Sequence, residues 1–309
     1  MPGTRWIDAG LRSCRLAMIS LLLVSWAGLA VASGSHPVLH GEGRLWRIER
    51  PGMPPSHIIG TIHVTDPRVR DLPGPIREAF ENSEQAAFEM RMTPDERQAM
   101  MLRLGTSERS QPLTKLVDGK TFDKLAEYAA RYGVPRDAVN KLHPFALIHL
   151  LSYPPDEHLR QADGDLVLDL WLIQWAYDLG MRVEGLESLD EHLGFIDKVP
   201  LRDHATMLRE LVAQLEEEPH YFDRLINDYL AGDMSRVLQE FEAEAEADPG
   251  VRVFKEAILD QRNHQMVERA IPILQRGKAF IAVGAAHLPG EEGMLNLLER
   301  RGFRITRIY

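Results

Sequence analysis

The stretch AFIAVGAAHLPG, residues 279–290, decides the fold because it runs an apolar strand directly into a Gly-x-x-His turn. A second stretch, SHIIGTIHV at residues 56–64, has the same order of features. Each histidine, His287 in the first and His63 in the second, is therefore expected at or just past the carboxyl end of a buried strand. In open α/β sheets, ligands bind at this edge.

The segments around these two stretches alternate between strand and helix patterns. Near the amino terminus, two strand-like runs over residues 43–50 and 56–64 flank a PGMPP turn and predict a hairpin, followed by a helix over 72–84 and a strand over 85–90. Near the carboxyl terminus, the pattern predicts a helix from 253 to 275, a strand over 278–284, a helix over 291–301 and a last strand over 303–309. Such alternation favours an α/β sheet covered by helices.

Helical patterns dominate the middle of the chain, from about residue 93 to 249. Residues 93–104 begin with Thr-Pro-Asp-Glu, a capping-box signature. Residues 166–180 are apolar nearly all round and predict a buried helix, and residues 181–187 predict one more core strand. The predicted fold is therefore α/β, with a central mixed sheet formed by the N- and C-terminal segments and a largely helical insert, which is expected to determine the substrate.

The amino-terminal 32 residues have the pattern of a secretory signal peptide. Three arginines precede the apolar run over residues 16–32, which ends in Ala-Val-Ala. Cleavage is expected after Ala32, which leaves a mature domain over 33–309 in the periplasm or outside the cell. The alternative is an uncleaved anchor, because 17 residues are close to the shortest run that spans a bilayer.

Cysteine content and charge exclude several function classes. The only cysteine, Cys14, lies in the expected signal peptide, so the mature chain would have no disulfide, no thiol nucleophile and no cysteine-ligated zinc. A net charge of −10 without a basic stripe argues against binding to nucleic acid or to anionic membrane surfaces. We therefore expect a peptide or small-molecule substrate and no stable membrane insertion after cleavage.

The two Gly-x-x-His turns suggest a metal site through their context. With 23 glycines and 12 histidines in 309 residues, about one such match arises by chance, so the bare pattern is weak. Glycine at the strand end lets the backbone approach another group closely. Two imidazoles at one sheet edge, from His63 and His287, could then bind one metal. The alternative for either histidine alone is a buried side chain hydrogen-bonded to the backbone.

Two glutamates occupy equivalent places at the ends of predicted strands. Glu89 ends the apolar run of residues 85–90, and Glu187 ends that of residues 181–187. A buried, ionised glutamate is costly unless it is paired, bound to metal or catalytic. Alternatively, each glutamate emerges into a solvated loop. Four strand ends that each deliver His or Glu to one sheet edge would favour a functional site.

Several motifs together resemble the TraB/GumN family, which includes PrgY and the animal Tiki proteins. They are IIGTIHV, AAFEM, VEGLES, LDQRNHQM and FIAVGAAHLPGEEGMLNLLERRGFRI, in this order, and the similarity extends from about Leu45 to Tyr309. The resemblance implies an α/β scaffold with a metal site, and the Tiki members are metal-dependent peptidases. Ser188 stands where the family usually has threonine, a difference with little chemical consequence.

The resemblance extends to individual residues. His63 and His287 match the two motif histidines, and Glu89 and Glu187 match the acidic positions. The Arg-Asn pair corresponds to Arg262 and Asn263, and the Asp-x-x-Leu pattern corresponds to Asp169.

These residues lead to the hypothesis of an exported metal-dependent hydrolase that acts on a peptide or ester bond. In it, His63 and His287 bind a divalent metal with Glu187, and Glu89 is the general base, although the two glutamates could exchange roles. Oxygen and nitrogen ligands suit Mn, Zn or Co.

The remaining two residues are given supporting roles. Arg262 would stabilise the developing oxyanion and Asn263 would orient its neighbours. The alternatives are a surface salt bridge for Arg262 and a solvent-facing position for Asn263.

The alternative function is a non-catalytic periplasmic binding protein that captures a secreted peptide or polysaccharide in the same crevice. A classical serine or zinc protease is disfavoured, because the sequence has neither Gly-x-Ser-x-Gly nor His-Glu-x-x-His.

Overall fold

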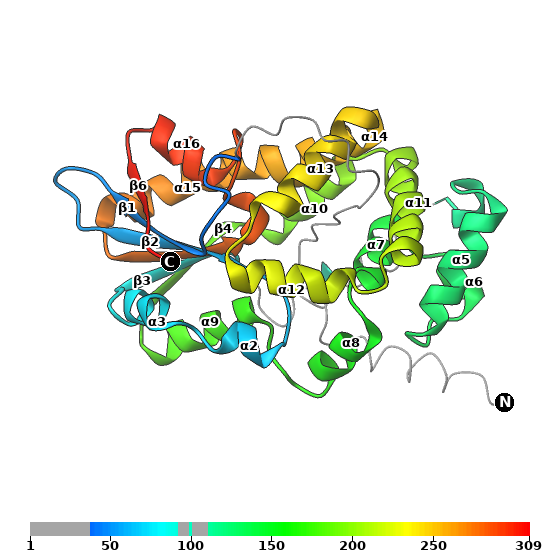
Figure 1. Ribbon diagram of the computed structural model, residues 1–309, viewed down its shortest axis with the longest axis horizontal. Coiled ribbons are helices and arrows are strands. Elements are labelled where there is room, and N and C mark those ends of the chain that lie inside the picture. Colours follow the sequence, from blue (N-terminus) through cyan, green and yellow to red (C-terminus); the bar gives the residue numbers. More distant parts are fainter. Residues whose placement is uncertain (1–37, 92–98, 101–110) are drawn as a thin grey trace.

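A six-stranded sheet forms the centre of the molecule in this computed structural model, which describes residues 38–91, 99–100 and 111–309 (Figure 1). The strand order is β4-β3-β5-β2-β1-β6. The strands are β1 (Leu45–Glu49), β2 (Ser56–Thr61), β3 (Gln85–Met90), β4 (Arg182–Glu187), β5 (Ala279–Gly284) and β6 (Arg304–Arg307). The predicted α/β class with a mixed central sheet is confirmed.

The helices alternate with the strands at both ends of the chain and, in its described middle, are interrupted only by β4. The amino-terminal ones are α2 (Pro67–Arg70) and α3 (Gly74–Glu81). The middle contains η1 (Leu113–Lys115), α5 (Gly119–Ala130), α6 (Arg136–Val139), α7 (Pro144–Leu151), α8 (Pro155–Ala162), α9 (Leu168–Asp178), α10 (Leu189–Lys198), α11 (Leu201–Glu217), α12 (Tyr221–Ala231) and α13 (Ser235–Ala247). Then come α14 (Pro249–Lys255), η2 (Glu256–Asp260), α15 (Gln261–Arg276), η3 (Ala285–His287) and α16 (Met294–Arg300).

The sheet brings the two Gly-x-x-His turns together. Strands β1 and β2 form the predicted antiparallel hairpin, whereas β2, β5, β3 and β4 are parallel neighbours. The register pairs Thr61 with Gly284, so both turns leave the same edge of the sheet side by side. All six residues of β3 and all six of β5 are buried, as expected of parallel strands covered on both faces.

Two expectations for the middle of the chain need correction. Strand β4 is an outer strand of the sheet, and its first four residues are exposed or half-buried, so it is a core strand only at Leu186 and Glu187. Helix α9 is not buried all round. It packs against β3 and β4 on one side, but its residue Tyr177 is 46% exposed. One side of α9 therefore faces solvent despite its apolar sequence. Of the helix predicted over residues 93–104, only residues 99 and 100 are described, and both are helical.

The helix expected from residue 253 to 275 begins earlier and contains an irregular turn. Helix α14 starts at Pro249, with Asp248 as its N-cap, and continues through the π-helical turn η2 into α15. π-helical turns inside α-helices occur frequently at functional sites. Here the turn directly precedes Arg262 and Asn263.

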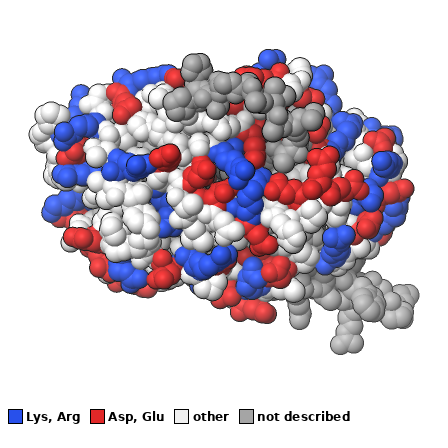
Figure 2. All heavy atoms as spheres, viewed as in Figure 1, with Lys and Arg blue, Asp and Glu red and all other residues white. Residues whose placement is uncertain are grey.

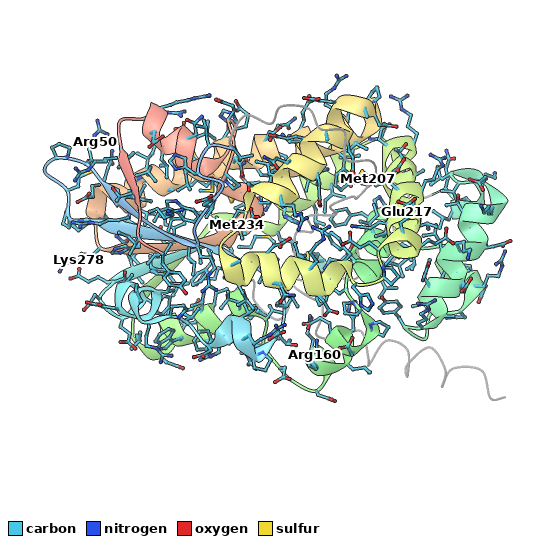
Figure 3. All side chains as sticks on the ribbon, in the orientation of Figure 1. Arg50, Arg160, Met207, Glu217, Met234 and Lys278 are labelled. Atoms are coloured by element: carbon cyan, nitrogen blue, oxygen red, sulfur yellow. The ribbon has the colours of Figure 1, made fainter. Side chains whose placement is uncertain are left out.

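Two hydrophobic cores lie on opposite faces of the sheet. The smaller core packs α15 and α16 against one face. The larger core packs α3 and α9 against the other face and continues between the helices of the insert. Aromatic stacking joins these layers, since the Phe80 ring lies 4.4 Å from Trp175 and 4.9 Å from Phe280, centroid to centroid. Met207 and Met234 are buried between the insert helices, whereas Glu217 and Lys278 lie on the surface (Figure 3).

Acidic and basic side chains are interspersed over the face shown in Figure 2. Many are paired, as Arg224 is with Glu218 and Glu240. Within the described ranges, no helix is both long enough and apolar enough to cross a bilayer. The expected signal peptide, residues 1–32, lies outside these ranges.

Candidate metal centre

Four neighbouring parallel strands deliver the four predicted His and Glu side chains to one edge of the sheet. Glu89 and Glu187 lie in β3 and β4, and His63 and His287 follow β2 and β5. All four are buried, with exposed fractions of 2–7%. The alternative of solvated glutamates in loops is therefore wrong.

The two motif glycines allow the close packing of this edge. A Cβ on Gly284 would lie 3.0 Å from Glu89 Oε1, 3.5 Å from His287 Cδ2 and 3.9 Å from His63 Nε2. The glycine therefore lies where three candidate groups surround one point. A Cβ on Gly60 would come within 3.0 Å of the Ala285 backbone, so this glycine lets the two turns pack against each other.

Arg262 lies behind these groups and is fully buried, so the alternative of a surface salt bridge is wrong. Its Nε and Nη2 donate to the two oxygens of Glu187 at 2.9 and 2.5 Å, and Nη2 also donates to Glu89 Oε2 at 2.9 Å. Its Nη1 donates to the Ile258 carbonyl at 2.9 Å and to His287 Nε2 at 3.0 Å. All five N–H donors of the guanidinium are thus used within the protein.

Asn263 fixes the tautomer of His287. The asparagine is 1% exposed, so it does not face solvent as the alternative held. Its Nδ2 donates to the Glu292 carbonyl, which leaves Oδ1 to accept from His287 Nδ1 at 2.5 Å. His287 therefore carries its proton on Nδ1 and turns the Nε2 lone pair toward Arg262 and toward Glu89 Oε1, 3.7 Å away.

Asp169 contacts the equivalent nitrogen of His63. Its Oδ2 lies 2.7 Å from His63 Nδ1, in an ion-pair contact that is not aligned as a hydrogen bond. Its Oδ1 accepts from Thr61 Oγ1 at 2.5 Å, which ties the contact to the same strand end. His63 Nε2 is buried and has no partner among the described residues.

His192 contacts Glu187 and was not among the site residues predicted from the sequence. His192 Nδ1 lies 3.0 Å from Glu187 Oε1, and both side chains are buried. The capping box of Ser188 and Glu191 starts α10 directly after β4 and so turns His192 back onto the strand end. The position of His192 five residues after Glu187, in the first turns of a capped helix, was the available signal.

The electrostatics differ between the two histidines. Burial lowers the pKa of His287 to about 4, against the opposing effect of Glu89. Burial also acts to lower the pKa of His63, but Asp169 outweighs it and raises that pKa above its ordinary value. Burial acts to raise the pKa of Glu89, but His287 and Arg262 outweigh it and hold that pKa well below its ordinary value. Glu89 is therefore ionised at neutral pH and His287 is neutral.

In the described part of the chain, no group of three His, Cys, Asp or Glu side chains is arranged to hold a metal ion. The nitrogen and oxygen donors at this sheet edge are nevertheless of the types that divalent metals bind. His63 Nε2 is a buried nitrogen with no hydrogen-bond partner among the described residues, and Glu89 Oε1 and the His287 ring lie beside the same point at Gly284. His287 Nε2 accepts from Arg262 Nη1 at 3.0 Å. Each imidazole also has its Nδ1 turned toward an oxygen acceptor, as metal-binding histidines commonly do. Each oxygen of Glu89 accepts one hydrogen bond, from the Gly284 N–H or from Arg262, whereas Glu187 accepts two from Arg262 and also contacts His192.

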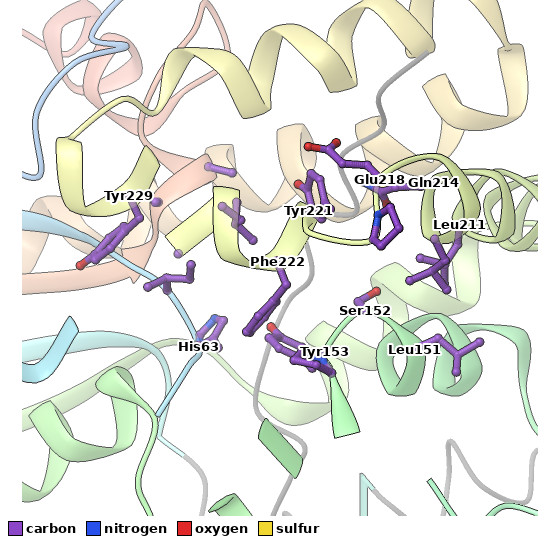
Figure 4. A pocket seen from close by; sticks show the side chains of 18 of the residues that line it. His63, Leu151, Ser152, Tyr153, Leu211, Gln214, Glu218, Tyr221, Phe222 and Tyr229 are labelled. Atoms are coloured by element: carbon purple, nitrogen blue, oxygen red, sulfur yellow. The ribbon is translucent and has the colours of Figure 1, made fainter. Parts of the chain in front are cut away.

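A pocket of about 230 Å³ opens beside this centre and is lined by His63, Gly284 and side chains of the insert (Figure 4). The predicted site residues are thus brought together, and His63 is the one that borders the pocket.

Comparison with known proteins identifies several relatives at low identity. A Metalloprotease TIKI homolog from Amphimedon queenslandica is 23% identical over 96% of this chain and 68% of its own length. Metalloprotease TIKI1 from Danio rerio is 23% identical over 84% of this chain and 62% of its own length. An uncharacterized protein from Treponema pallidum is 21% identical, covering 88% of this chain and 85% of that protein. No solved structure matches.

The chain spans about two thirds of the length of the two animal relatives. The sequence profile of the TraB/PrgY/gumN family matches residues 44–307, which include all four strand ends and the Arg262–Asn263 pair. The chain belongs to the TraB/PrgY/gumN family.

Proposed function

We propose that the protein is an exported, metal-dependent hydrolase that cleaves peptide bonds. The observation that carries the proposal is the matched orientation of the two histidines. In each, Nδ1 faces an oxygen acceptor, Asp169 or Asn263, and the opposite side of the ring faces Gly284. His63 Nε2 lies 3.9 Å, and His287 Cδ2 3.5 Å, from the point where a Cβ on Gly284 would stand. The metalloprotease names of the animal relatives support the same reaction class.

The residues that would hold the metal are His63, His287 and Glu89. We favour Glu89 over Glu187 as the carboxylate ligand, because Glu89 Oε1 lies 3.7 Å from His287 Nε2, whereas Glu187 accepts two hydrogen bonds from Arg262 and contacts His192. Three protein ligands leave positions open for water and substrate, as in catalytic zinc sites. The bound ion would supply Lewis acidity and lower the pKa of water.

Hydrogen bonds from neighbouring residues hold Glu89 and His287 in position. The Gly284 N–H donates to Glu89 Oε1 at 2.5 Å and Arg262 donates to Glu89 Oε2, so the carboxylate is held ionised and in place. Asn263 keeps the proton of His287 on Nδ1, so the Nε2 lone pair, which accepts from Arg262 Nη1 here, would bind a metal only in place of that hydrogen bond. All N–H groups of Arg262 already donate within the protein, so we assign it a positioning role. Its two hydrogen bonds to Glu187 hold the guanidinium plane in place.

A peptide-cleavage assay tests the proposal. The mature protein from Ser33 onward, loaded separately with Mn, Zn or Co, should cleave members of a peptide pool, and a chelator should abolish cleavage. Glu89→Gln should lower kcat/KM by about 10³-fold, because a metal contributes several kcal/mol to transition-state stabilisation. Glu184→Gln, on the outer part of β4, is the matched control and should retain activity.

Tight capture of a peptide or polysaccharide that no chelator weakens, without turnover under any metal, would instead support the non-catalytic binding protein.

A further inference from the structure

The pocket beside His63 joins the sheet edge to the helical insert. Its inner end is formed by the two turns, through His63 and Gly284, and its remaining walls come from α5, α7, α11 and α12. Figure 4 shows Phe222 and Tyr153 between His63 and the leucines Leu151 and Leu211. A group in this pocket would therefore lie directly beside the candidate metal centre.

The walls are aromatic and aliphatic, and their positions are fixed by contacts. The rings of Tyr153 and Phe222 meet edge to face, with centroids 5.6 Å apart. Tyr132 donates its hydroxyl to the Tyr153 carbonyl at 2.6 Å, which fixes this wall to α5. Phe222 and Leu225 are only half-buried although they line the pocket, so they expose apolar surface to whatever enters.

The charged side chains of the pocket are already paired within the protein. Glu218 accepts from Arg224 at 2.7 Å, and Arg131 lies over the Tyr128 ring at 4.7 Å. Asp233 accepts from the Ser235 hydroxyl, and His63 contacts Asp169. A charged group on a ligand would lose its hydration here and would have to displace these existing contacts to gain a counter-charge. The lining therefore favours an apolar group.

Its size favours a single side chain. About 230 Å³ is below the roughly 300–1,000 Å³ of pockets that hold a whole small-molecule ligand. We propose that this pocket binds one large apolar side chain of a peptide substrate, next to the bond that is cleaved. This inference rests on the proposed function and assigns its substrate class: peptides with an aromatic or large aliphatic residue beside the scissile bond.

Peptides that differ at one residue test the pocket. After a peptide pool has located the scissile bond, each flanking position is varied among Phe, Leu, Ala and Asp. At one flanking position, the metal-loaded protein should prefer Phe or Leu over Asp by at least about tenfold in kcat/KM. Leu225→Trp, which fills the pocket, should remove the preference by lowering kcat/KM for the Phe and Leu peptides to the level of the Ala peptide. Leu159→Trp is the matched control, because Leu159 is 65% exposed.

Thermal unfolding of both variants verifies that they fold. Cleavage without a side-chain preference at any position would overturn the inference and leave the proposed function standing.

If no peptide is cleaved, the proposed function fails and the pocket is judged by binding alone. N-acetyl-phenylalaninamide, observed by NMR with the metal-free protein, should then perturb His63 and Phe222 signals in the parent but not in Leu225→Trp. The inference would be overturned if N-acetyl-phenylalaninamide did not bind, or if octanoate bound and N-acetyl-phenylalaninamide did not.

Discussion

Replacing Arg262 with methionine is expected to lower the free energy of unfolding by about 3–5 kcal/mol, because it leaves two buried carboxylates without their cation. Glu89 and Glu187 are 7% and 4% exposed, so water cannot solvate them in its place. For a domain of this size, the loss corresponds to a fall in Tm of about 10 °C. Urea unfolding at pH 7, with thermal unfolding beside it, measures the effect.

The difference between parent and variant should depend on pH in a defined direction. Burial acts to raise the pKa of Glu187, but Arg262 outweighs it and lowers this pKa to about 2; the pKa of Glu89 is lowered as well. A carboxylate with a lowered folded-state pKa stabilises fully above its unfolded pKa, about 4.3, and loses this contribution as pH falls toward the folded pKa. The gap between parent and variant should therefore be full at pH 7 and shrink between about pH 4.5 and pH 2.

Arg269 provides the control on the same helix. It pairs with Glu191, and both side chains are at least one-third exposed, so Arg269→Met should cost about 1 kcal/mol or less. Equal stability of the two variants at pH 7 would contradict the assigned role of Arg262.

Replacing His287 with glutamine is expected to lower kcat/KM for peptide cleavage by about 10³-fold or more, with a smaller effect on folding. Glutamine lacks the Nε2 lone pair that would bind the proposed metal beside Glu89. The several kcal/mol by which that metal would stabilise the transition state would be lost with it. His63→Gln should act in the same way. Activity at saturating metal concentration, beside a thermal unfolding curve, separates the loss of chemistry from the loss of fold.

His204→Gln is the matched control for this pair. His204 is fully buried in α11, but its neighbours are the rings of His143, Phe145 and Phe254 rather than carboxylates. It should retain activity even where it unfolds at a lower temperature. If His204→Gln abolishes activity while His287→Gln does not, the histidine assignment is wrong.

The sequence was sufficient to predict the strand ends, because their signals are local. An apolar run followed by Gly-x-x-His defines a strand and its last residues, and parallel pairing then places His63 and His287 together. The burial of β4 could not be predicted in this way. Its apolar residues are compatible with a central or an outer strand, and the sheet order that decides between them is set by contacts distant in sequence.

The roles of the two glutamates were also beyond prediction. Glu89 and Glu187 have the same strand-end position, and only three-dimensional contacts distinguish the one that faces His287 from the one held by Arg262 and His192. The resemblance to the family indicated Arg262 and Asn263 as site residues. The π-helical turn that directs them toward the sheet edge leaves no clear periodicity in sequence.

Metal content of the purified mature protein tests the central claim most directly. The protein is produced from Ser33 without a His tag, remetallated with Mn, Zn or Co, dialysed, and measured by elemental mass spectrometry beside the double variant His63→Ala, His287→Ala. We expect close to one metal ion per chain in the parent and no bound metal in the double variant. Equal metal content in the two proteins, or none in the parent after remetallation, would contradict this expectation.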